Sequence, residues 1–419
     1  MVVLYYHNTT SVKSKQIFGL NPNVFFLGLV SFLTDVSSEM IFTLLPLFLL
    51  NVLGVATTVI GLIEGMADAT ASLFRILSGW LSDRLGKRKG LTILGYGLST
   101  AVKPLMYIAS TWGMVLGVRF CDRMGKGVRT APRDALVADS VTSEQRGKAF
   151  GLHRAMDTFG AMVGIISAAV VVFLWQGGSL ELSRATYQQL VLIGIIPAVI
   201  ALFIFFFIKE PERSPAPQSS PPMGRMRKLT FGLDKRFWIF LGIIFLFTLG
   251  NSSDAFLILR AQNLGNPVLT ILLMLVLFNF VYASLSTPAG ILSDKLGRRR
   301  IILLGWLIYT LVYLGFAMAS VSWQIWLLFG FYGVYYGLAE GVARAFVADL
   351  VPEEKRGTAY GLFHGIVGVT LLPASLIAGY LWQYGWPWQE AAMNPAAPFF
   401  FGAIMAFLAM IGFLVLVKE

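Results

Sequence analysis

The chain has 419 residues, of which 56% are hydrophobic and only 13% are charged, and its mean hydropathy is +0.72. Soluble domains carry about 25% charged residues, so this composition excludes an ordinary soluble protein. The formal net charge of +11 does not indicate nucleic-acid binding, because the basic residues are grouped in loops between long apolar blocks. The single cysteine, Cys121, excludes an intramolecular disulfide.

The apolar blocks predict membrane-spanning helices. A helix needs roughly 20 mainly apolar residues to cross a bilayer, and the chain contains about twelve such blocks. We therefore expect an all-α membrane protein with twelve transmembrane helices and no sizeable soluble domain. The fourth block is the exception to the apolar pattern, because it is full of charge. In chain order the blocks cover residues 22–50, 57–80, 90–111, 113–136, 147–175, 188–208, 236–262, 268–291, 300–320, 323–349, 357–384 and 396–417.

Lysine and arginine are concentrated in every second loop. DRLGKRK (83–89), TSEQRGK (142–148) and DKLGRRR (294–300) are basic, whereas the alternate loops NVLGVATT, STWG, NLGNP and ASVSW contain no Lys or Arg. In membrane proteins an excess of Lys and Arg marks the cytoplasmic side. The pattern predicts that both termini and the basic loops are cytoplasmic.

An internal repeat divides the chain. GWLSDRLGKRK (79–89) returns as GILSDKLGRRR (290–300), and ALVADSVTSEQRGKAFGL (135–152) returns as AFVADLVPEEKRGTAYGL (345–362). The segment SSE at 37–39 also resembles SSD at 252–254. We expect an N-terminal six-helix half over 1–208, a cytoplasmic linker over 209–235 and a C-terminal six-helix half over 236–419. The linker is rich in Pro and Ser, which is typical of a segment that buries no core.

These features together resemble the major facilitator superfamily, whose signature loop between helices 2 and 3 matches G-x-x-x-D-R-x-G-K-R at 79–88. The stretch GKGVRTAPRDAL in helix 4 resembles a prokaryotic branch, which implies the cytoplasmic (inner) membrane. The resemblance implies a monomer and a loop that latches the two halves together in the outward-open state. The alternative is a charge cluster that only sets topology. The expected latch residues are Gly79, Asp83, Arg84, Gly86, Arg88, Arg133, Asp139, Gly290, Asp294, Arg298, Arg344 and Asp349.

Ionisable residues inside the apolar blocks are the candidate functional residues. A charge at mid-bilayer costs about 2.5 kcal/mol or more on insertion scales, so it needs a partner or a water-filled cavity. Asp35 and Glu39, in the segment TDVSSEM, lie four residues apart on one helix face, and the resemblance implies that helices 1, 4, 7 and 10 line a central cavity. The candidates for substrate binding or proton coupling are Asp35, Glu39, Glu64, Asp68, Arg119, Arg123, Lys126, Arg154 and Asp254.

Two interpretations of these charges stay open. In one, acids and bases pair and lock the helices together, as Arg75 with Asp68, Arg344 with Glu340 and Arg154 with Asp157. In the other, Asp35 or Glu39 faces a wet cavity and changes protonation as water access changes, which proton coupling requires.

Two further patterns concern the substrate. Arg119, Arg123, Lys126 and Arg133 form a basic stripe on helix 4, which favours an anion held by bidentate arginine contacts. Helix 5 lacks the Gly-Pro motif usual in drug/proton antiporters of the superfamily, which counts against ordinary cationic-drug efflux. Tyrosines of helices 8 and 10 are candidate cavity walls for a planar or amphiphilic ligand, namely Tyr282, Tyr332, Tyr335 and Tyr336.

The expected function is secondary active transport of a small organic solute by alternating access, coupled to protons, with an anionic or amphiphilic substrate. The alternatives are efflux of drugs, amphiphiles or lipid-linked compounds and, in another class, a non-transporting membrane receptor on the same fold. The chain has no G-x-x-x-x-G-K-[ST], no H-E-x-x-H and no Cys/His cluster. We therefore expect no enzyme activity, no cofactor and no metal. The expected partners are a small molecule, the proton and the lipid bilayer, and no nucleic acid.

Overall fold

The computed structural model describes residues 17, 19–85, 88–142, 145–210, 233–352, 355–386 and 391–417, and this part of the chain is helical and contains no β-sheet. Nine helical segments within these ranges are long and apolar enough to cross a membrane. The second, third and fourth predicted spans are not among these nine segments. They correspond to α3, α4 and α5, of which α3 and α5 carry many charges and α4 is short. The predicted all-α membrane architecture is confirmed, and these three segments fill the places of the remaining spans.

The first half contains seven numbered α-helices. The bounds are α1 (Pro22–Phe42), α2 (Leu45–Leu47) with the π-helical turn Phe48–Val52, α3 (Thr57–Leu85), α4 (Lys89–Val102) with the 3₁₀ turn Lys103–Met106, α5 (Trp112–Asp139), α6 (Arg146–Gln176) and α7 (Arg184–Ile204). The second half runs from α8 (Lys235–Gly250) and α9 (Ala255–Asn263) through α10 (Val268–Leu296), α11 (Arg298–Met318), α12 (Ser322–Asp349) and α13 (Arg356–Tyr384) to α14 (Ala397–Leu416).

Several helix ends follow local sequence signals. Asn21 caps α1 by accepting a hydrogen bond from the backbone N–H of Asn23, and Pro22 occupies the first turn. Ser183 caps α7 in the same way. Gly297 ends α10 with a φ of 89°, a conformation that suits glycine.

The seventh predicted span, 236–262, matches one candidate membrane span, Lys235–Asn263, but its helix is interrupted in the middle. The helix stops at Gly250 and restarts at Ala255, because Asn251, Ser252 and Ser253 favour local hydrogen bonds over a helical ladder. Tyr309 donates to the Gly250 carbonyl oxygen at 3.1 Å, and the Ser253 backbone N–H donates to the Ser375 hydroxyl at 3.2 Å. Irregular backbone at membrane depth occurs where it is buried in protein or lines a cavity, so this break marks a place to look for a site.

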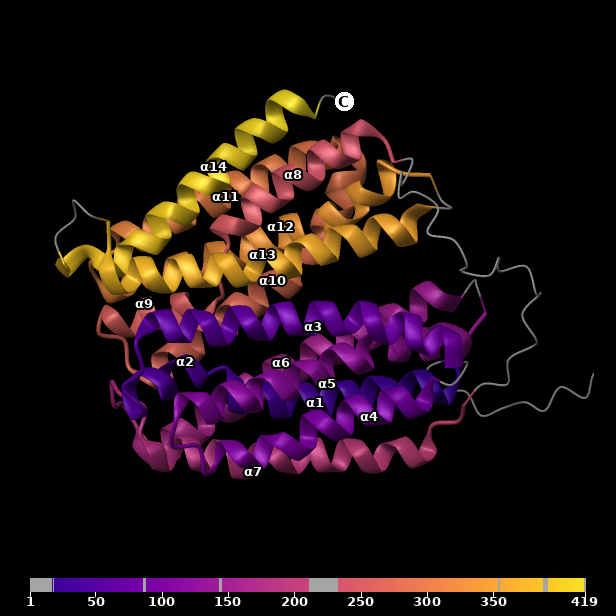
Figure 1. The fold of residues 1–419 in the computed structure, drawn as a ribbon, viewed down its shortest axis with the longest axis horizontal. Helices are drawn as coiled ribbons and strands as arrows, with labels where there is room; N and C mark the ends of the chain where they lie inside the picture. The colour runs from indigo at the N-terminus through magenta and orange to yellow at the C-terminus, as the bar shows by residue number, and fades with distance from the viewer. Residues whose placement is uncertain are drawn as a thin grey trace, which may run out of the picture.

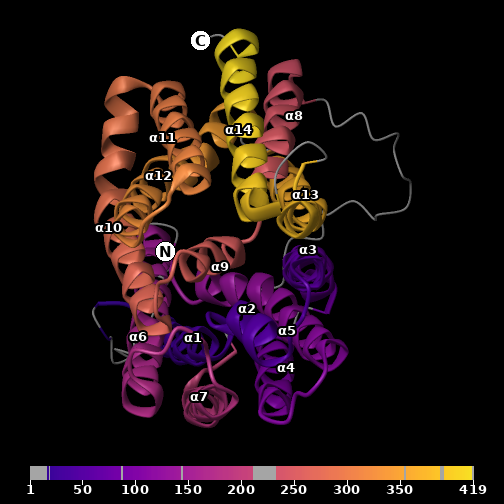
Figure 2. The same ribbon diagram turned by 90° about the vertical axis from the view of Figure 1, so that its left-hand side faces the viewer.

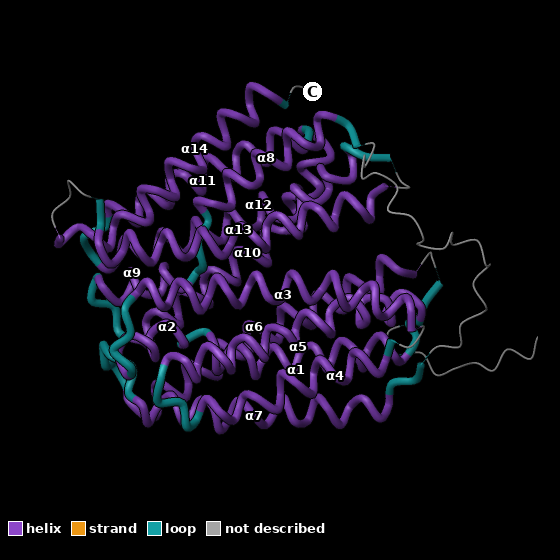
Figure 3. Tube along the Cα trace, in the orientation of Figure 1, coloured by secondary structure: helices purple, strands orange, loops and turns teal. Residues whose placement is uncertain are grey.

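The helices form two bundles that lie side by side. In Figures 1 and 3, α1 to α7 make up one bundle and α8 to α14 the other. Figure 2 shows the same molecule turned by 90°, with α10 beside α6 at one edge and α3 beside α13 at the other. Both seams between the bundles are lined by packed helix pairs, α3 with α13 and α6 with α10.

The bundles are joined mainly at one end. The Thr57 hydroxyl donates to the Gly379 carbonyl at 3.3 Å, and the Gln262 side chain donates to the Leu180 carbonyl at 2.7 Å. Toward the opposite end, where the chain ends in Figure 1, α8 and α14 diverge from the first bundle. Between the two ends, the Arg154 side chain of α6 donates to the Tyr282 hydroxyl of α10 at 3.3 Å. The molecule is therefore closed at the end with few basic loop residues.

Candidate functional site

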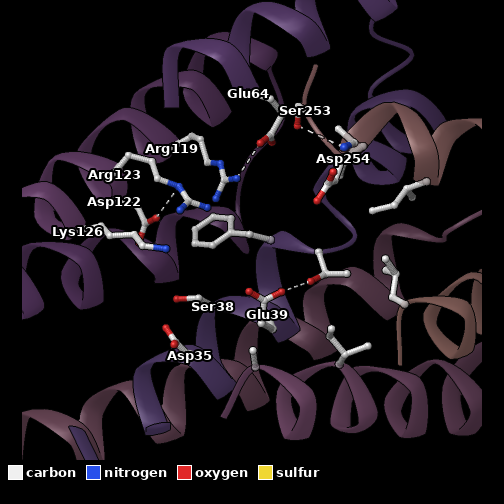
Figure 4. Close-up of a pocket in the computed structure, with 18 of the residues that line it drawn as sticks. Asp35, Ser38, Glu39, Glu64, Arg119, Asp122, Arg123, Lys126, Ser253 and Asp254 are labelled. Carbon is white, nitrogen blue, oxygen red and sulfur yellow. Dashed lines mark hydrogen bonds and ion pairs between the residues drawn. The ribbon is translucent and has the colours of Figure 1, made fainter. Parts of the chain in front are cut away.

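A cavity of about 270 Å³ lies between the bundles, where α1 and α5 face the break between α8 and α9 (Figure 4). It brings together most of the charges that the sequence placed inside the membrane. Its acidic lining residues are Asp35, Glu39, Glu64, Asp122 and Asp254, and its basic lining residues are Arg119, Arg123, Lys126 and Arg129.

Two glycines bring α5 close to its neighbours. A Cβ on Gly125 would lie 2.6 Å from the carbonyl oxygen of Gly95 in α4, and a Cβ on Gly127 would lie 2.7 Å from that of Ala71 in α3. A side chain at either position would push the helices apart, so glycine is needed for this approach. The close packing holds the charged residues of α5 against α3 and α4.

Two of the cations on α5 have acidic neighbours. The Arg119 guanidinium donates to Glu64 of α3 at 2.8 Å, and both side chains are buried. Arg123 lies 3.8 Å from Asp122, whose other oxygen accepts a hydrogen bond from Ser99. Arg119, Arg123 and Glu64 were all candidate site residues, and all three line this cavity.

Not every donor in this cluster is paired. Within the described residues, Nε and Nη1 of Arg119 and of Arg129 are buried and have no hydrogen-bond partner. The Arg129 guanidinium packs over the Tyr96 ring at 4.3 Å, and that of Arg119 over the Phe42 ring at 4.6 Å. A buried unsatisfied donor costs about 1–3 kcal/mol, and more when charged. These guanidinium groups are therefore suited to water or to an oxyanion in the cavity.

The two carboxylates of TDVSSEM line the same cavity. In Figure 4, Asp35, Ser38 and Glu39 lie across from the cations of α5. Glu39 accepts a hydrogen bond from the Thr43 hydroxyl at 2.6 Å. Asp35 and Glu39 thus lie on one face of α1, as their four-residue spacing predicts, and that face borders the same cavity as the bases of α5.

Lys103 was not among the candidates, and the structure places it beside them. Its side chain is fully buried, and its Nζ donates to the hydroxyls of Ser37 at 2.8 Å and Ser38 at 3.0 Å. A lysine inside an apolar block just before Pro104 was the available signal. The sequence does not show which helix it contacts, because that depends on how the third span packs against α1.

A second cavity of about 430 Å³ adjoins the first, and both are lined by Glu64, Ser253 and Asp254. Asp68 and Arg344 also line it. Its wall also contains five aromatic residues, Phe247, Trp306, Tyr335, Tyr336 and Phe363. Charged and aromatic walls therefore meet at the break between α8 and α9.

The four predicted cavity tyrosines separate into three positions. Tyr335 and Tyr336 line the second cavity. Tyr332 differs from the prediction: it is 1% exposed and lines neither central cavity, and its hydroxyl donates to Asp254 at 2.7 Å. It faces inward because its ring packs among other rings of α10, α11 and α12. Tyr282 lies at the seam between α6 and α10.

Arg154 also differs from its prediction, since it lies at the α6–α10 seam and lines neither central cavity. It is 3.5 Å from Asp157 on its own helix and donates to the Tyr282 hydroxyl of the other bundle at 3.3 Å. Tyr282 in turn donates to Glu340, which pairs with Arg344. Two of the three predicted acid–base pairs are thus present; Arg75 makes no ion pair with Asp68 among the described residues.

The expected latch residues form ion pairs inside each bundle. Arg88 pairs with Asp139 at 3.0 Å in the first bundle, and Arg298 pairs with Asp349 at 3.1 Å in the second. Arg298 is also 3.6 Å from Asp294. Both pairs join the start of a third helix to the end of a fourth helix, as the internal repeat predicts.

The remaining latch candidates have varied surroundings. Arg84 lies over the Trp80 ring at 5.4 Å, and Arg133 pairs with Asp134 at 2.9 Å. A Cβ on Gly79 would contact Ala131 at 3.5 Å, whereas one on Gly290 would meet no atom within 4 Å. Gly86 and the side chain of Asp83 lie outside the described residues.

Comparisons with known proteins agree with this architecture. A sequence model of the Major Facilitator Superfamily matches residues 27–260 and 239–419. An uncharacterized MFS-type transporter of Methanocaldococcus jannaschii is 37% identical over 402 residues, which cover 93% of this chain and 94% of that protein.

Two solved structures have the same fold. The nucleoside transporter NupG superposes with a TM-score of 0.76 at 14% identity, covering 94% of this chain and 99% of that one. A D-xylose–proton symporter superposes with a TM-score of 0.76 at 15% identity, covering 94% and 97%. Two helical bundles surround a charged cavity, a family model matches nearly the whole chain, and a full-length relative is 37% identical. This protein therefore belongs to the major facilitator superfamily and is a multi-pass membrane transporter.

Proposed function

We propose that the chain is a proton-coupled secondary transporter of a small organic anion that has an apolar or aromatic part. The observation that carries the proposal is the set of buried, unpaired guanidinium donors of Arg119 and Arg129 at a cavity that also contains Asp35 and Glu39. Arginine is suited to carboxylate and phosphate oxygens because its planar group presents several donors in a fixed geometry.

The charge composition of the cavity supports coupling of the anion to a proton. Glu64 and Asp122 have Arg119 and Arg123 as neighbours, so Asp35, Glu39 and Asp254 are left to balance Lys126 and Arg129. An anion entering this cavity adds a negative charge where carboxylates already equal or exceed the cations. Protonation of one carboxyl compensates for that charge. Asp35 and Glu39 are the proposed coupling residues, and a D-xylose–proton symporter shares the fold.

The adjoining cavity suggests the apolar part of the substrate. Its wall contains Phe247, Trp306, Tyr335 and Tyr336, and aromatic rings favour stacked or edge-on contacts with other rings. Because the two cavities share Glu64, Ser253 and Asp254, one molecule can place its anionic group near α5 and its apolar part against these rings. This arrangement favours an aromatic or amphiphilic carboxylate over a small, fully polar anion.

The remaining features belong to the same proposal. The loop charges support a location in the inner membrane with both termini in the cytoplasm. Because the bundles are closed at the end with few basic loop residues, this orientation makes the observed conformation inward-facing. The repeat supports two six-helix halves, 1–208 and 236–419, joined by the cytoplasmic linker 209–235. The latch residues would hold the cytoplasmic ends together in the outward-open state, and the chain would act as a monomer. The GKGVRTAPRDAL stretch supports a prokaryotic branch of the family.

The test is substrate-evoked proton flux in liposomes that contain a pH-sensitive dye. The panel compares benzoate and phenylacetate with succinate and the cation tetraphenylphosphonium. We expect an aromatic carboxylate to evoke a pH change that is lost in Asp35→Asn or Glu39→Gln. Glu181→Gln, in an exposed loop, is the matched control and should transport normally.

Three outcomes would contradict the proposal. Anion uptake without proton movement in the wild type would remove the coupling role of Asp35 and Glu39. Transport of tetraphenylphosphonium alone would replace the anion with a cationic substrate. Ligand binding without uptake of any compound would favour a receptor.

A further inference from the structure

The two seams between the bundles are related by the internal repeat but are packed differently. Each seam joins the second helix of one half to the fifth helix of the other, α3 with α13 and α10 with α6. Glycines bring α3 and α13 into backbone contact: a Cβ on Gly61 would lie 2.2 Å from the Ser375 carbonyl oxygen, and one on Gly379 would lie 2.6 Å from that of Thr57. At these positions the two backbones touch, which leaves no space between them for a ligand.

The seam between α6 and α10 contains a groove of about 520 Å³. Gly151 lines it, and a Cβ on that glycine would meet no atom within 4 Å. Phe159, also in the lining, is 55% exposed, and neighbouring Phe280 is 61% exposed. In a membrane protein such an outward-facing apolar surface meets lipid, and lipid chains fill the space that the protein leaves.

The lining of the groove is amphipathic along the membrane normal. Arg154 lies eight residues from the start of α6, about 12 Å along the helix, on the side of the basic loops. Ser286 and Thr287 of α10 lie toward the same end, whereas Phe159 and Met162 lie one to two turns deeper. At that depth the polar lining residue of α10 is Asn279, which donates to its own helix at Leu275. A lipid entering from that leaflet would place its headgroup at the polar end and a chain at the apolar end.

Arg154 makes the groove selective for negative charge. It is the charged residue among those that line the groove, and 57% of its side chain is exposed. A guanidinium has five N–H donors, and the contacts of Arg154 with Asp157 and Tyr282 are long, at 3.5 and 3.3 Å. Donors therefore remain for a phosphate oxygen, with the Tyr282, Ser286 and Thr287 hydroxyls nearby in the lining.

We propose that the α6–α10 groove binds one anionic phospholipid, with its phosphate at Arg154 and an acyl chain along Phe159 and Met162. The occupant is a lipid of the surrounding leaflet and not a soluble anion, because the groove opens on the apolar surface of the bundle. The site lies at the side of the bundles and shares the lining residue Asn279 with the first cavity, but its occupant differs from the transported substrate. It places a lipid across a lateral seam that protein packing leaves open.

Lipid retention measured by native mass spectrometry tests the site. Purified full-length protein is equilibrated with equal amounts of palmitoyl-oleoyl phosphatidylglycerol and phosphatidylcholine. We expect one tightly held phosphatidylglycerol, with a preference that falls about fivefold in Arg154→Gln, the effect of one arginine near anionic lipid. Arg154→Lys should keep most of the preference. Arg236→Gln, an exposed arginine at the start of α8, is the matched control and should behave as the wild type.

A second variant tests the shape of the groove. Ala283→Trp fills it while Arg154 stays in place, and it should reduce retention of both lipids at the first site. The proposal is overturned if Arg154→Gln keeps its lipid preference, or if Arg236→Gln loses it to the same extent. Each variant is scored only on monodisperse protein, and the readout does not require transport, so failure here leaves the proton-flux result unaffected.

Discussion

Glu64 and Arg119 illustrate how this protein accommodates charge inside the membrane. Their side chains are only 7% and 5% exposed and lie 2.8 Å apart. Each charge removes much of the desolvation penalty of the other, but the pair adds little to stability compared with apolar residues of the same size. Its presence between α3 and α5, at the wall of the cavity, is better explained by the chemistry of the site than by stability.

Breaking this pair should have a specific energetic signature. Glu64→Gln or Arg119→Gln alone leaves a buried charge without its partner, at a cost of about 3–5 kcal/mol. The double variant should lose less than the sum of the two single losses, because neither charge remains. Thermal unfolding in detergent, monitored by the reaction of Cys121 with a thiol-reactive dye, measures the stability losses of the single and double variants. Strictly additive losses would show that the pair does not interact.

At the scale of elements, small residues decide which helices can meet. Gly61 and Gly65 allow α3 to touch α13, while Gly125 and Gly127 allow α5 to touch α4 and α3. None of these contacts follows from helical periodicity, since a glycine in an apolar block indicates only that some neighbour can approach. The break between α8 and α9 is similar, because its polar backbone is satisfied by Tyr309 and Ser375 from distant helices.

A matched pair of glycine substitutions tests the α3–α13 contact. Gly61→Ala places a Cβ 2.2 Å from the Ser375 carbonyl oxygen, so the seam must open, at a cost of about 1–3 kcal/mol. Gly97→Ala in α4 meets no atom within 4 Å and should be neutral or stabilising. The two melting temperatures in detergent provide the comparison. Equal melting temperatures would mean that the seam is not closely packed in solution.

At the scale of the whole molecule, the structure joins the bundles at one end and pairs the latch residues within each bundle. The cavities lie between the bundles, so exchange of substrate with the other side requires the joined end to open. We therefore expect rigid-body rocking of the bundles about the central site, as in other transporters built from repeats.

Locking the joined end should stop transport and preserve binding. In a Cys121→Ser background, cysteines at Thr57 and Gln383, whose side chains are 3.1 Å apart, are bridged with a short bis-methanethiosulfonate, which forms reducible disulfides with both thiols. We expect uptake to fall to background, with ligand binding in detergent retained, and reduction to restore uptake. Uptake that continues in the bridged protein would exclude rocking at this seam. Either single-cysteine protein treated with the reagent is the control.

The sequence by itself determined the class of this protein and the inventory of its site. Long apolar blocks specify membrane helices because a bilayer accepts little else. The charged residues inside the apolar blocks were recognisable because charge is costly there; they are Asp35, Glu39, Glu64, Arg119, Arg123 and Lys126. Only the tertiary structure decided that Lys103 holds Ser37 and Ser38, that Tyr332 binds Asp254 and that Arg154 lies at a lateral groove. Periodicity gives the face of a helix on which a side chain lies, whereas its partner depends on which helices pack together and how closely.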